Sequence, residues 1–499
     1  MAYGDDADGS AAPRPTEPRA LTAASTHPAG RLGTLVAALR DGEMTAESDP
    51  LRRGPWHWPA LIVWAGAWYA SKTAFGGQSW HFSVQGARLL LHGAARGQPA
   101  GGLDLFADYP KLQSGPLTFL LADPVTWLTG GATGAAGSGG RSAGLHVAEV
   151  LMTLLGILAL FALERAAFAL RPDAAPSRIR WTVLGGGAAM LPVWIMAGVY
   201  WAHFDDILAL TFAALAVWAA ARRRPVLLGL CVACSVDAKP WAAGFLALLF
   251  ALPGRQRRTA VAVGLALVAA AWLPFVIADP HTVHAVGFTI PNARDSALRA
   301  LGVSDPRTPS WDRPAQIVLG CLLGALAVWR GRWPAVLLLG ACARLAIEPN
   351  DYPYYFAGAV VGALAWDLLA ARRPAPLATL GVTALIFASR AVGASPAFYG
   401  RLKLLAMVVA AAAALFAPAV RTARPAIRPA VRPAVRAPDL AARTGSAAGG
   451  AGKTVIPAPA IAPDRRGELR EAASATSFVT RSVPTSASSL GRRGDDLGG

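Results

Sequence analysis

Apolar segments recur along this chain from Trp58 to Pro418, and no interval between them is long enough to hold a soluble domain. A helix needs about 20 mainly apolar residues to cross a hydrocarbon core of about 30 Å. Many segments reach or approach this length, and charged residues make up only 15% of the chain, against about 25% in soluble domains. The pattern predicts an all-α polytopic membrane protein with one membrane domain over residues 54–420.

The number of apolar segments predicts about twelve transmembrane helices, within a range of about 10 to 13. Several segments are shorter than a perpendicular helix needs, which favours tilted or broken helices, most of all within residues 225–252. The predicted spans are Trp58–Phe75, Gly144–Phe168, Trp181–Trp201, Asp206–Ala221, Pro225–Ser235, Trp241–Leu252, Thr259–Ala278, Pro314–Trp329, Trp333–Ile347, Pro353–Ala370, Pro374–Ser389 and Leu402–Ala417.

Basic residues occur as short arginine groups between the apolar segments, not as a stripe with interleaved aromatic residues. Cytoplasmic loops carry an excess of Lys and Arg, and the groups alternate consistently with the spans when both termini are cytoplasmic. Orientation in an inner membrane thus explains the formal charge of +17, and nucleic acid is not an expected partner. The groups are Arg52 and Arg53, Arg171–Arg180, Arg222–Arg224, Arg255–Arg258, Arg330–Arg332, and Arg372 and Arg373.

The same alternation predicts a long first outer loop over residues 76–143. Its apolar stretch Pro116–Leu128 is expected to be re-entrant or to lie on the surface, because a full span there would place Arg171–Arg180 outside. The Asp123-Pro124 pair in its middle suits a broken segment better than a continuous span. Trp80–His92 has the weak helical pattern of an interfacial helix.

The two ends of the chain lie outside the membrane domain. Residues 1–53 lack the start of a cleavable signal peptide and are predicted to form a disordered cytoplasmic tail. Residues 421–499 contain 13 basic and six acidic residues in a stretch rich in Pro, Ala, Ser and Gly, which cannot bury a core. We predict a disordered, basic cytoplasmic tail that either lies on anionic lipid or is simply solvated.

The unusual polar residues of the chain fall mainly on the outer side of this topology. Ionisable groups at membrane depth are costly unless paired or hydrated, so they usually mark a site. Four such groups at one face predict a shared cavity. They are Asp104, Asp108, Tyr109, Lys111 and Gln113-Ser114 in the first loop; His203-Phe-Asp205-Asp206; Asp237-Ala-Lys239-Pro240-Trp241; and Arg344 with Glu348, Asp351, Tyr354 and Tyr355.

Simpler roles are open to these residues. One of the carboxylates Asp205 and Asp206 could cap its helix, although two in a row after His203 exceed what capping needs. Lys239 could extend to the membrane surface, but lysine is scarce in this chain, so an ammonium group here suits a point-charge contact to phosphate. The aromatic residues could form an interfacial belt or stack on a sugar ring.

Carboxylates, His, Lys and Arg at one face suit a reaction between a lipid phosphate and a hydroxyl group. A carboxylate acts as general base on the hydroxyl, and cations hold the leaving phosphate as charge develops. The sequence contains no Walker loop, no dinucleotide glycine fingerprint and no H-E-x-x-H motif, so nucleotide binding and zinc hydrolysis are not expected. A lipid-linked donor fits an outer site, where nucleotide sugars are not available.

The order of the motifs carries a family resemblance. A Tyr-Pro then Gly-Pro segment in the first loop precedes His203-Phe-Asp205-Asp206 and Lys239-Pro240-Trp241, and Arg344 precedes Glu348-Pro349 and Tyr354-Tyr355. This order resembles the integral-membrane glycosyltransferases of the GT-C superfamily, most closely the actinobacterial mannosyltransferase-like proteins of glycosyltransferase family 87. The likeness covers the membrane domain and neither tail. It implies a GT-C fold in a bacterial inner membrane.

The resemblance also implies an inverting transfer of a sugar, mannose foremost, from a polyprenyl-phosphate donor to an envelope glycolipid or polysaccharide, with an outer-loop aspartate as base. In the family pattern an acidic residue near the start of the first loop matters most, yet Gly77-Gln-Ser-Trp80-His81 offers none. The base is therefore sought among Asp206, Asp205, Asp104 and Asp108. Contacts to the donor phosphate and substrate are expected from His203, Lys239, Arg344, Lys111, Tyr354, Tyr355 and Trp241.

No metal-ligand set and no cofactor beyond the donor lipid are predicted, and a divalent-metal requirement is left open. The alternative function is a secondary transporter or flippase for a lipid-linked sugar, in which the same charges form a relay. Transporters tend to consist of two repeated halves, whereas the long first loop has no counterpart in the second half. A non-catalytic scaffold with the same fold is a third possibility.

Overall fold

The computed structural model describes residues 55–93, 99–128, 143–371, 373, 375–391 and 395–418. Every regular element in these ranges is a helix, and one isolated bridge joins Pro291 to Arg307. The all-α prediction is therefore confirmed for the described part of the chain. The tails predicted over residues 1–53 and 421–499 lie outside the described residues, as does the stretch 129–142 of the first loop.

Helices occur at each predicted apolar segment, in sequence order. The first half contains α2 (His57–Thr73), α3 (Trp80–Leu91), η2 (Gly102–Asp104), α4 (Leu105–Asp108), α5 (Pro116–Trp127), α6 (Ala143–Leu170), α7 (Pro176–Ile195), η3 (Met196–Tyr200), α8 (Phe204–Ala221), α9 (Pro225–Ala238) and η4 (Pro240–Phe250). The second half contains α10 (Gly254–Ala278), η5 (Pro280–Gly287), α11 (Ala297–Ala300), α12 (Asp312–Trp329), η6 (Trp333–Ala335), α13 (Val336–Ala346), η7 (Pro353–Phe356), α14 (Ala357–Leu369), α15 (Leu377–Ala391) and α16 (Pro396–Phe416).

Five helical segments of the described chain are long and apolar enough to cross a membrane: α6, α7 with η3, α8, α10 and α16. Shorter apolar helices of 10–17 residues form over α9, η4, η6 with α13, η7 with α14, and part of α15. The break that the sequence suggests within residues 225–252 falls between α9 and η4, where Pro240 cannot continue the hydrogen-bond ladder of α9. The total of about twelve spans stays a prediction.

The helices differ sharply in how far protein covers them. The apolar window of α8 is 78% buried, whereas that of the 25-residue helix α10 is 17% buried. Large apolar side chains of α10 are exposed, among them Leu265, Leu273 and Ile277. Exposing such a surface to water costs roughly 25 cal/mol per Å². A helix that is apolar all round and largely uncovered fits contact with lipid.

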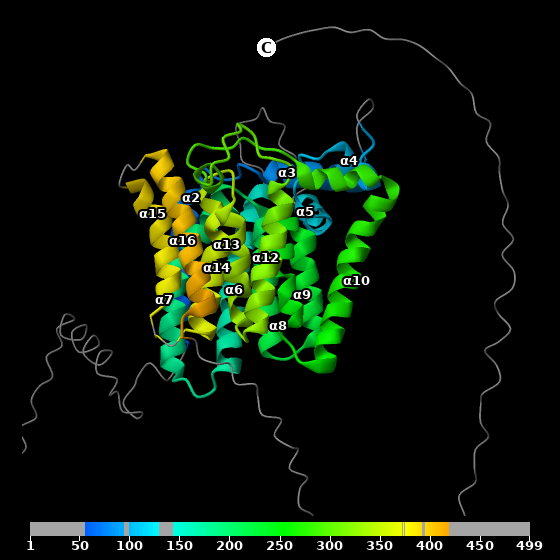
Figure 1. Cartoon of the computed structure of the whole chain (residues 1–499). Helices are drawn as coiled ribbons and strands as arrows, with labels where there is room; N and C mark the ends of the chain where they lie inside the picture. Colours follow the sequence, from blue (N-terminus) through cyan, green and yellow to red (C-terminus); the bar gives the residue numbers. More distant parts are fainter. Residues whose placement is uncertain are drawn as a thin grey trace, which may run out of the picture. The chain divides into compact units, whose positions relative to one another are not determined.

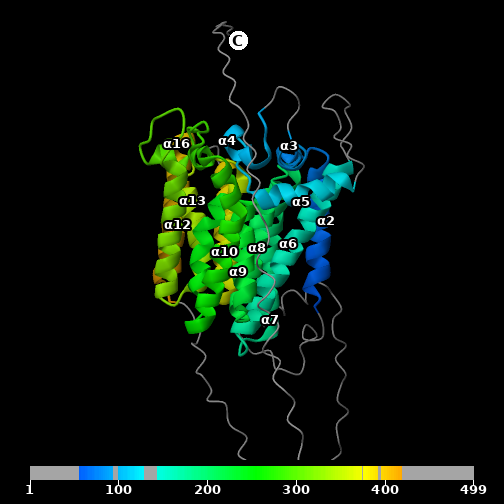
Figure 2. The ribbon, with the colours of Figure 1, turned by 90° about the vertical axis from the view of Figure 1, so that its right-hand side faces the viewer.

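Polar features divide between the two ends of the helix bundle. The arginine groups 171–180, 222–224, 255–258 and 330–332 follow or precede helices at one end, which we call the arginine end. At the opposite end, which is called the site end, α3, α4 and η5 lie above the bundle in Figure 1 and α5 lies just beneath them. Figure 2 shows α3 and α4 again at this end after a quarter turn, with α8 behind α9 and α10.

The first loop forms short helices at the site end. A helix covers Trp80–Leu91, close to the interfacial helix predicted from Trp80 to His92. α5 contains 12 residues and is continuous through Pro124, so the Asp123-Pro124 pair does not break the segment as the sequence suggested. Pro124 has no N–H group and so removes a single hydrogen bond from α5, while the helix continues to Trp127. Its length is too short for a perpendicular span.

Candidate active site

The chain turns sharply between α7 and α8. α7 continues into the π-helical turn η3, and Ala202 then has φ = 52°, a left-handed conformation that costs a non-glycine residue roughly 1 kcal/mol or more. Single π-turns inside helices are frequent at functional sites. The turn leaves His203 just before α8 and places Asp205 and Asp206 in the first turn of that helix.

Backbone hydrogen bonds attach the first loop to this turn. The amides of Gly77 and Ser79 donate to the carbonyls of Val199 at 3.0 Å and Trp201 at 2.8 Å. Gly77 has φ = 89°, a conformation that favours glycine. The Ser79 hydroxyl lies 3.4 Å from Nε2 of His203. The start of the first loop, which offers no carboxylate, therefore supplies a hydroxyl group to the site.

Asp205 is buried and fully engaged by protein groups. Its Oδ2 accepts a 2.6 Å hydrogen bond from the Ser114 hydroxyl and an ion-paired hydrogen bond from Lys239 Nζ. Its Oδ1 accepts from the backbone amide of Asp206 at 2.8 Å and lies 3.6 Å from Nδ1 of His203. A buried carboxylate requires such partners, because removing them leaves an uncompensated charge.

Asp206 has one engaged oxygen and one without a hydrogen-bond partner. Its Oδ1 accepts from Trp241 Nε1 at 2.7 Å and from Arg344 Nη1 at 3.3 Å. Its Oδ2 is buried and makes no hydrogen bond within the described part of the chain. His203 Nδ1 lies 3.9 Å from it, beyond hydrogen-bond range. Buried polar atoms without a partner are rare and call for a functional or structural explanation.

Arg344 links this pair of carboxylates to the start of α12. Its guanidinium lies over the rings of Trp241 and Tyr355, with 4.3 and 4.8 Å from Cζ to the ring centroids, and its Nε donates to Glu348 Oε2 at 3.3 Å. Glu348 Oε1 lies 3.7 Å from Nη1 of Arg313. Arg313 Nη1 also lies 3.5 Å from Gln316 Oε1, and Gln316 Nε2 donates to Asp312 at 3.2 Å. Alternating charges thus connect α8, α13 and α12.

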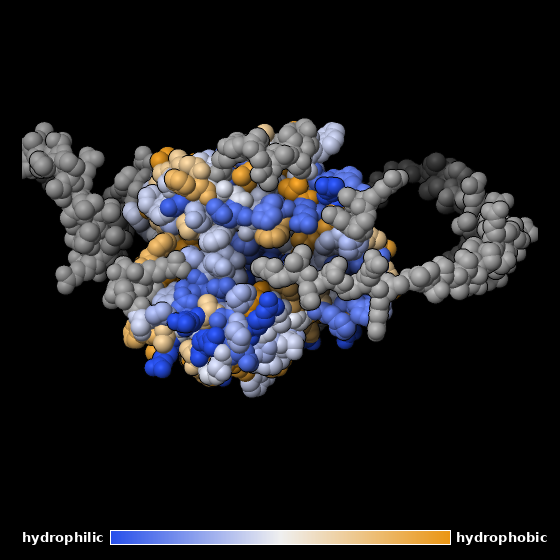
Figure 3. All heavy atoms as spheres, turned by 90° about the horizontal axis from the view of Figure 1, so that it is seen from above, coloured by the Kyte–Doolittle hydropathy of each residue, from blue (hydrophilic) through white to orange (hydrophobic). Residues whose placement is uncertain are grey.

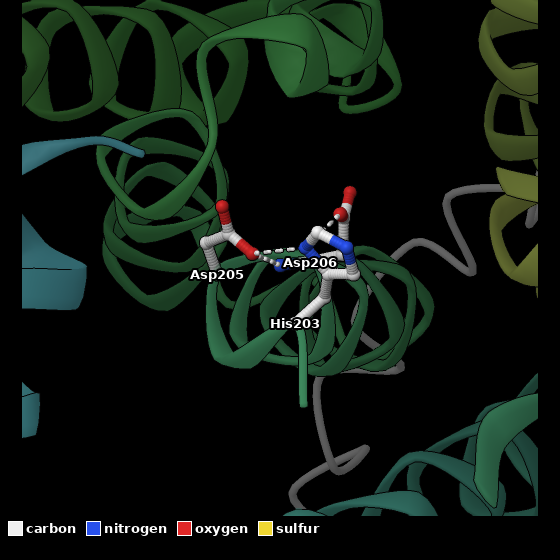
Figure 4. Close-up of side chains that lie close together, drawn as sticks. All are labelled: His203, Asp205 and Asp206. Carbon is white, nitrogen blue, oxygen red and sulfur yellow. Dashed lines mark hydrogen bonds and ion pairs between the residues drawn. The ribbon is translucent and has the colours of Figure 1, made fainter. Parts of the chain in front are cut away.

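His203 lies beside the carboxylates of Asp205 and Asp206 (Figure 4). Its ring stacks on that of Tyr354, with centroids 4.0 Å apart. Each of His203, Asp205 and Asp206 offers one ligand atom within 4.8 Å of the others, so the trio could hold a metal ion. No such set is predicted from the sequence. A cation there would compete for these carboxylates with Lys239 and Arg344, which already neutralise them.

A cavity of about 410 Å³ opens beside these groups. One part of its wall is polar, and another part is apolar and comes from α10, η5, α12 and the first loop. Figure 3 looks onto the site end and shows hydrophilic side chains gathered among hydrophobic ones. The apolar wall contains Phe106, Val268, Trp272, Ala285, Val286, Phe288 and Ile317. The cavity therefore suits an amphiphilic ligand with a polar head.

The structure brings most of the predicted site residues together at this cavity. Its lining includes His203, Asp205, Asp206, Lys239, Trp241, Arg344, Tyr354, Tyr355 and Lys111. The two first-loop aspartates are not among them. Asp104 lies in η2, and Asp108 lines a second cavity of about 520 Å³ beside His281 and His284. Asp108 Oδ2 accepts from the amide of Gly101 at 3.3 Å, a contact within its own loop.

Three polar residues of the site were not singled out from the sequence, whereas Ser114 belongs to the polar first-loop group that the sequence predicts to lie at the site. Ser79 comes from the first loop, and Arg313 and Gln316 come from the first turns of α12. Ser79 carries no sequence signal beyond a polar neighbourhood. Arg313 does carry one, because an arginine at the end of a span that the sequence predicts to face outside is an exception to the positive-inside rule. An arginine directly before the apolar run of α12 could have been flagged on that ground.

Comparison with protein-family models, with curated proteins and with solved structures finds no match to this chain. The fold is that of an all-helical protein with several helices long and apolar enough to cross a membrane. Its function is therefore argued from the site itself.

Proposed function

We propose that this protein is a GT-C-type membrane glycosyltransferase that moves a sugar, foremost mannose, from a polyprenyl-phosphate donor to an envelope glycolipid or polysaccharide. The observation that carries the proposal is the cavity in which Asp206 keeps a buried oxygen without a hydrogen-bond partner among the described residues, beside cations and an apolar wall. A base, a place for a phosphate and a place for a hydrocarbon chain are the parts that this reaction needs.

Asp206 is the favoured base among the four candidate aspartates. In the proposed step the acceptor hydroxyl gives its proton to Asp206 Oδ2, and its oxygen forms a bond to the anomeric carbon of the sugar. The bond between that carbon and the phosphate oxygen breaks, and polyprenyl phosphate leaves with the electron pair. Trp241 and Arg344 hold the other oxygen of Asp206 and so orient the carboxylate. Asp205 orients Lys239 and His203 through its own contacts.

The remaining predicted residues have roles consistent with their contacts. Lys239 and Arg344 make their hydrogen bonds to the carboxylates and add positive potential beside the leaving phosphate. His203 and Tyr354 form a stacked pair at the cavity wall, next to the proposed base. Lys111 is exposed and lines the cavity from the first loop. Asp104 and Asp108 lie away from these groups and are less well supported as bases.

The proposed location is a bacterial inner membrane that the chain crosses several times, with both termini in the cytoplasm. Arginine groups gather at the end of the bundle opposite the site. Under the positive-inside rule the site then faces the outside, where a lipid-linked donor is the available kind of activated sugar. Membrane lipids are the surroundings of the helices, and nucleic acid is not a proposed partner.

A transporter or flippase for a lipid-linked sugar is the second candidate. The observation that favours it is the break between α9 and η4 at Lys239, because transporter binding sites are often formed by discontinuous helices near charged residues. The cavity and its ion pairs would then carry a substrate or a proton instead of supporting a covalent step.

Sugar transfer tests the proposal. Proteoliposomes containing the full-length chain receive radiolabelled polyprenyl-phosphate mannose and extracted envelope acceptors, and the label that reaches the acceptors is measured. We expect transfer with the wild type and a loss of about 10²-fold to 10⁴-fold with Asp206→Asn, whereas Asp104→Asn stays near wild type. If the wild type transfers no label while a known transferase does, the proposal fails, and movement of lipid-linked sugar across the bilayer becomes the assay.

A further inference from the structure

Four lysine and arginine side chains line the cavity, and two of them form ion pairs with buried carboxylates. Lys239 forms an ion pair with Asp205, and its side chain is 12% exposed. Arg344 is 6% exposed, bonds to Asp206 and Glu348, and lies over the rings of Trp241 and Tyr355. Both cations compensate buried carboxylates, so a shift of either one toward a ligand would weaken that compensation. The other two cations are Lys111 and Arg313.

Arg313 is held loosely and is partly accessible. Its Nη1 lies 3.7 Å from Glu348 and 3.5 Å from Gln316, both longer than a normal hydrogen bond. Neither Nη2 nor Nε has a protein partner in the described part of the chain, although a guanidinium carries five N–H donors. Its side chain is 18% exposed. Lys111, in contrast, is exposed, so water and salt screen its charge.

The position of Arg313 on α12 matches an amphiphilic ligand. Arg313 is the second residue of this helix, so it lies beside backbone amides that attract anions. Ile317, four residues later on the same face, belongs to the apolar wall and lies about 6 Å further along the helix axis. A cationic group near the site end is thus followed by apolar surface deeper in the bundle.

We propose that Arg313 binds the phosphate group of a lipid-phosphate ligand, with its unpartnered N–H groups donating to two phosphate oxygens. Guanidinium groups favour this forked arrangement, which an ammonium group cannot reproduce. The inference rests on the proposed function and adds to it the residue that holds the donor at its phosphate. Glu348 contacts both Arg313 and Arg344. When phosphate takes the place of Glu348 at Arg313, the hydrogen bond from Arg344 to Glu348 remains.

Ligand binding without sugar transfer tests this proposal. Full-length protein in nanodiscs of zwitterionic lipid is titrated with dodecyl phosphate, which carries a phosphate head and a hydrocarbon chain, and separately with inorganic phosphate. The variants are Arg313→Gln, Arg313→Lys and the control Arg307→Gln, which alters an exposed arginine of the loop before α12. Thermal unfolding of each variant shows whether it is folded, and Arg313→Lys keeps the positive charge beside Glu348.

We expect the wild type and Arg307→Gln to bind dodecyl phosphate equally. Arg313→Gln should bind it about 10-fold to 100-fold more weakly, as expected for lost hydrogen bonds to a charged group, and Arg313→Lys should lie between. Inorganic phosphate should bind more weakly than dodecyl phosphate. If its binding also depends on Arg313, the two ligands share one anion site and the hydrocarbon chain adds affinity.

Two outcomes would overturn separate claims. Equal binding of dodecyl phosphate by the wild type and folded Arg313→Gln removes Arg313 from the site and leaves the proposed function standing. Absence of dodecyl phosphate binding by the wild type contradicts the lipid-phosphate donor itself, and with it the proposed function.

Discussion

Trp241 and Asp206 come from different helices and meet through one short hydrogen bond, in which the indole Nε1 donates to Oδ1 at 2.7 Å. An indole N–H group can only donate a hydrogen bond, so this bond holds Oδ1 of Asp206 in place as its acceptor. Arg344 bonds to the same oxygen at 3.3 Å and stacks on the same indole. The two contacts leave Oδ2 of Asp206 as the oxygen available to a ligand of the cavity.

Replacing Trp241 with phenylalanine removes this donor and keeps an aromatic ring beside Arg344. We expect Trp241→Phe to lower kcat for sugar transfer about 10-fold, because a buried acceptor that loses its partner costs roughly 1 to 3 kcal/mol. The amount of protein in the membrane should change little. Trp329→Phe, at a side chain that is 81% exposed, is the matched control. An unchanged kcat in Trp241→Phe would show that this bond does not orient the base.

The Lys239–Asp205 ion pair should be important for folding as well as for the site. Lys239→Met leaves Asp205 buried without its cation, which typically destabilises by about 3 to 5 kcal/mol. Thermal unfolding in nanodiscs measures the effect. Neutralising the unpaired Asp205 carboxylate as well, in the double variant Asp205→Asn/Lys239→Met, should recover much of the lost stability. A double variant no more stable than Lys239→Met would contradict this account of the pair.

Gly115 should tolerate no side chain, because of its close approach to α9. A Cβ built there would lie 2.0 Å from the carbonyl oxygen of Asp237, and the Gly115 amide donates to the carbonyl of Ala238 at 2.8 Å. We expect Gly115→Ala to displace Ser114 from Asp205 and to lower both unfolding temperature and sugar transfer. Gly66→Ala is the control, since nothing lies within 4 Å of its added Cβ. Equal behaviour of the two variants would show that the loop adjusts freely.

Lys403 anchors α16 to the segment that carries the aromatic residues of the site. Its side chain is fully buried, and its Nζ donates to the Asn350 carbonyl at 3.1 Å and to Asp351 Oδ1 at 3.3 Å. We expect Lys403→Met to increase amide hydrogen exchange over residues 348–355 and to reduce transfer. Lys403→Arg, which keeps the charge, should be milder. Unaltered exchange in Lys403→Met would mean that other contacts hold this segment.

The sequence predicts the helices well because each apolar segment carries its own signal. Helices form even at the short segments around Pro240. The Asp123-Pro124 pair was misleading, because an interior proline removes one hydrogen bond of the helix and here does not end it. Orientation and the total number of spans rest on rules about the membrane, which the packing of the described helices alone does not test.

The sequence was less informative about how the site residues divide their contacts. Sequence spacing indicated that His203, Asp205 and Asp206 act together, since they start one helix. It gave no way to tell that Asp205 is engaged at both oxygens and Asp206 at one, because Ser114, Trp241 and Arg344 come from distant segments. Asp104 and Asp108 seemed equivalent candidates until the folded first loop separated them from the cavity.

The sparse protein cover over α10 determines what lies behind the cavity wall. Val268 and Trp272 line the cavity, yet they belong to the helix whose apolar window is only 17% buried. On its other side, that helix faces the lipid of the membrane. Replacing a bilayer with a detergent micelle therefore changes the material that supports one side of the cavity, while residues on α8 keep the same protein surroundings.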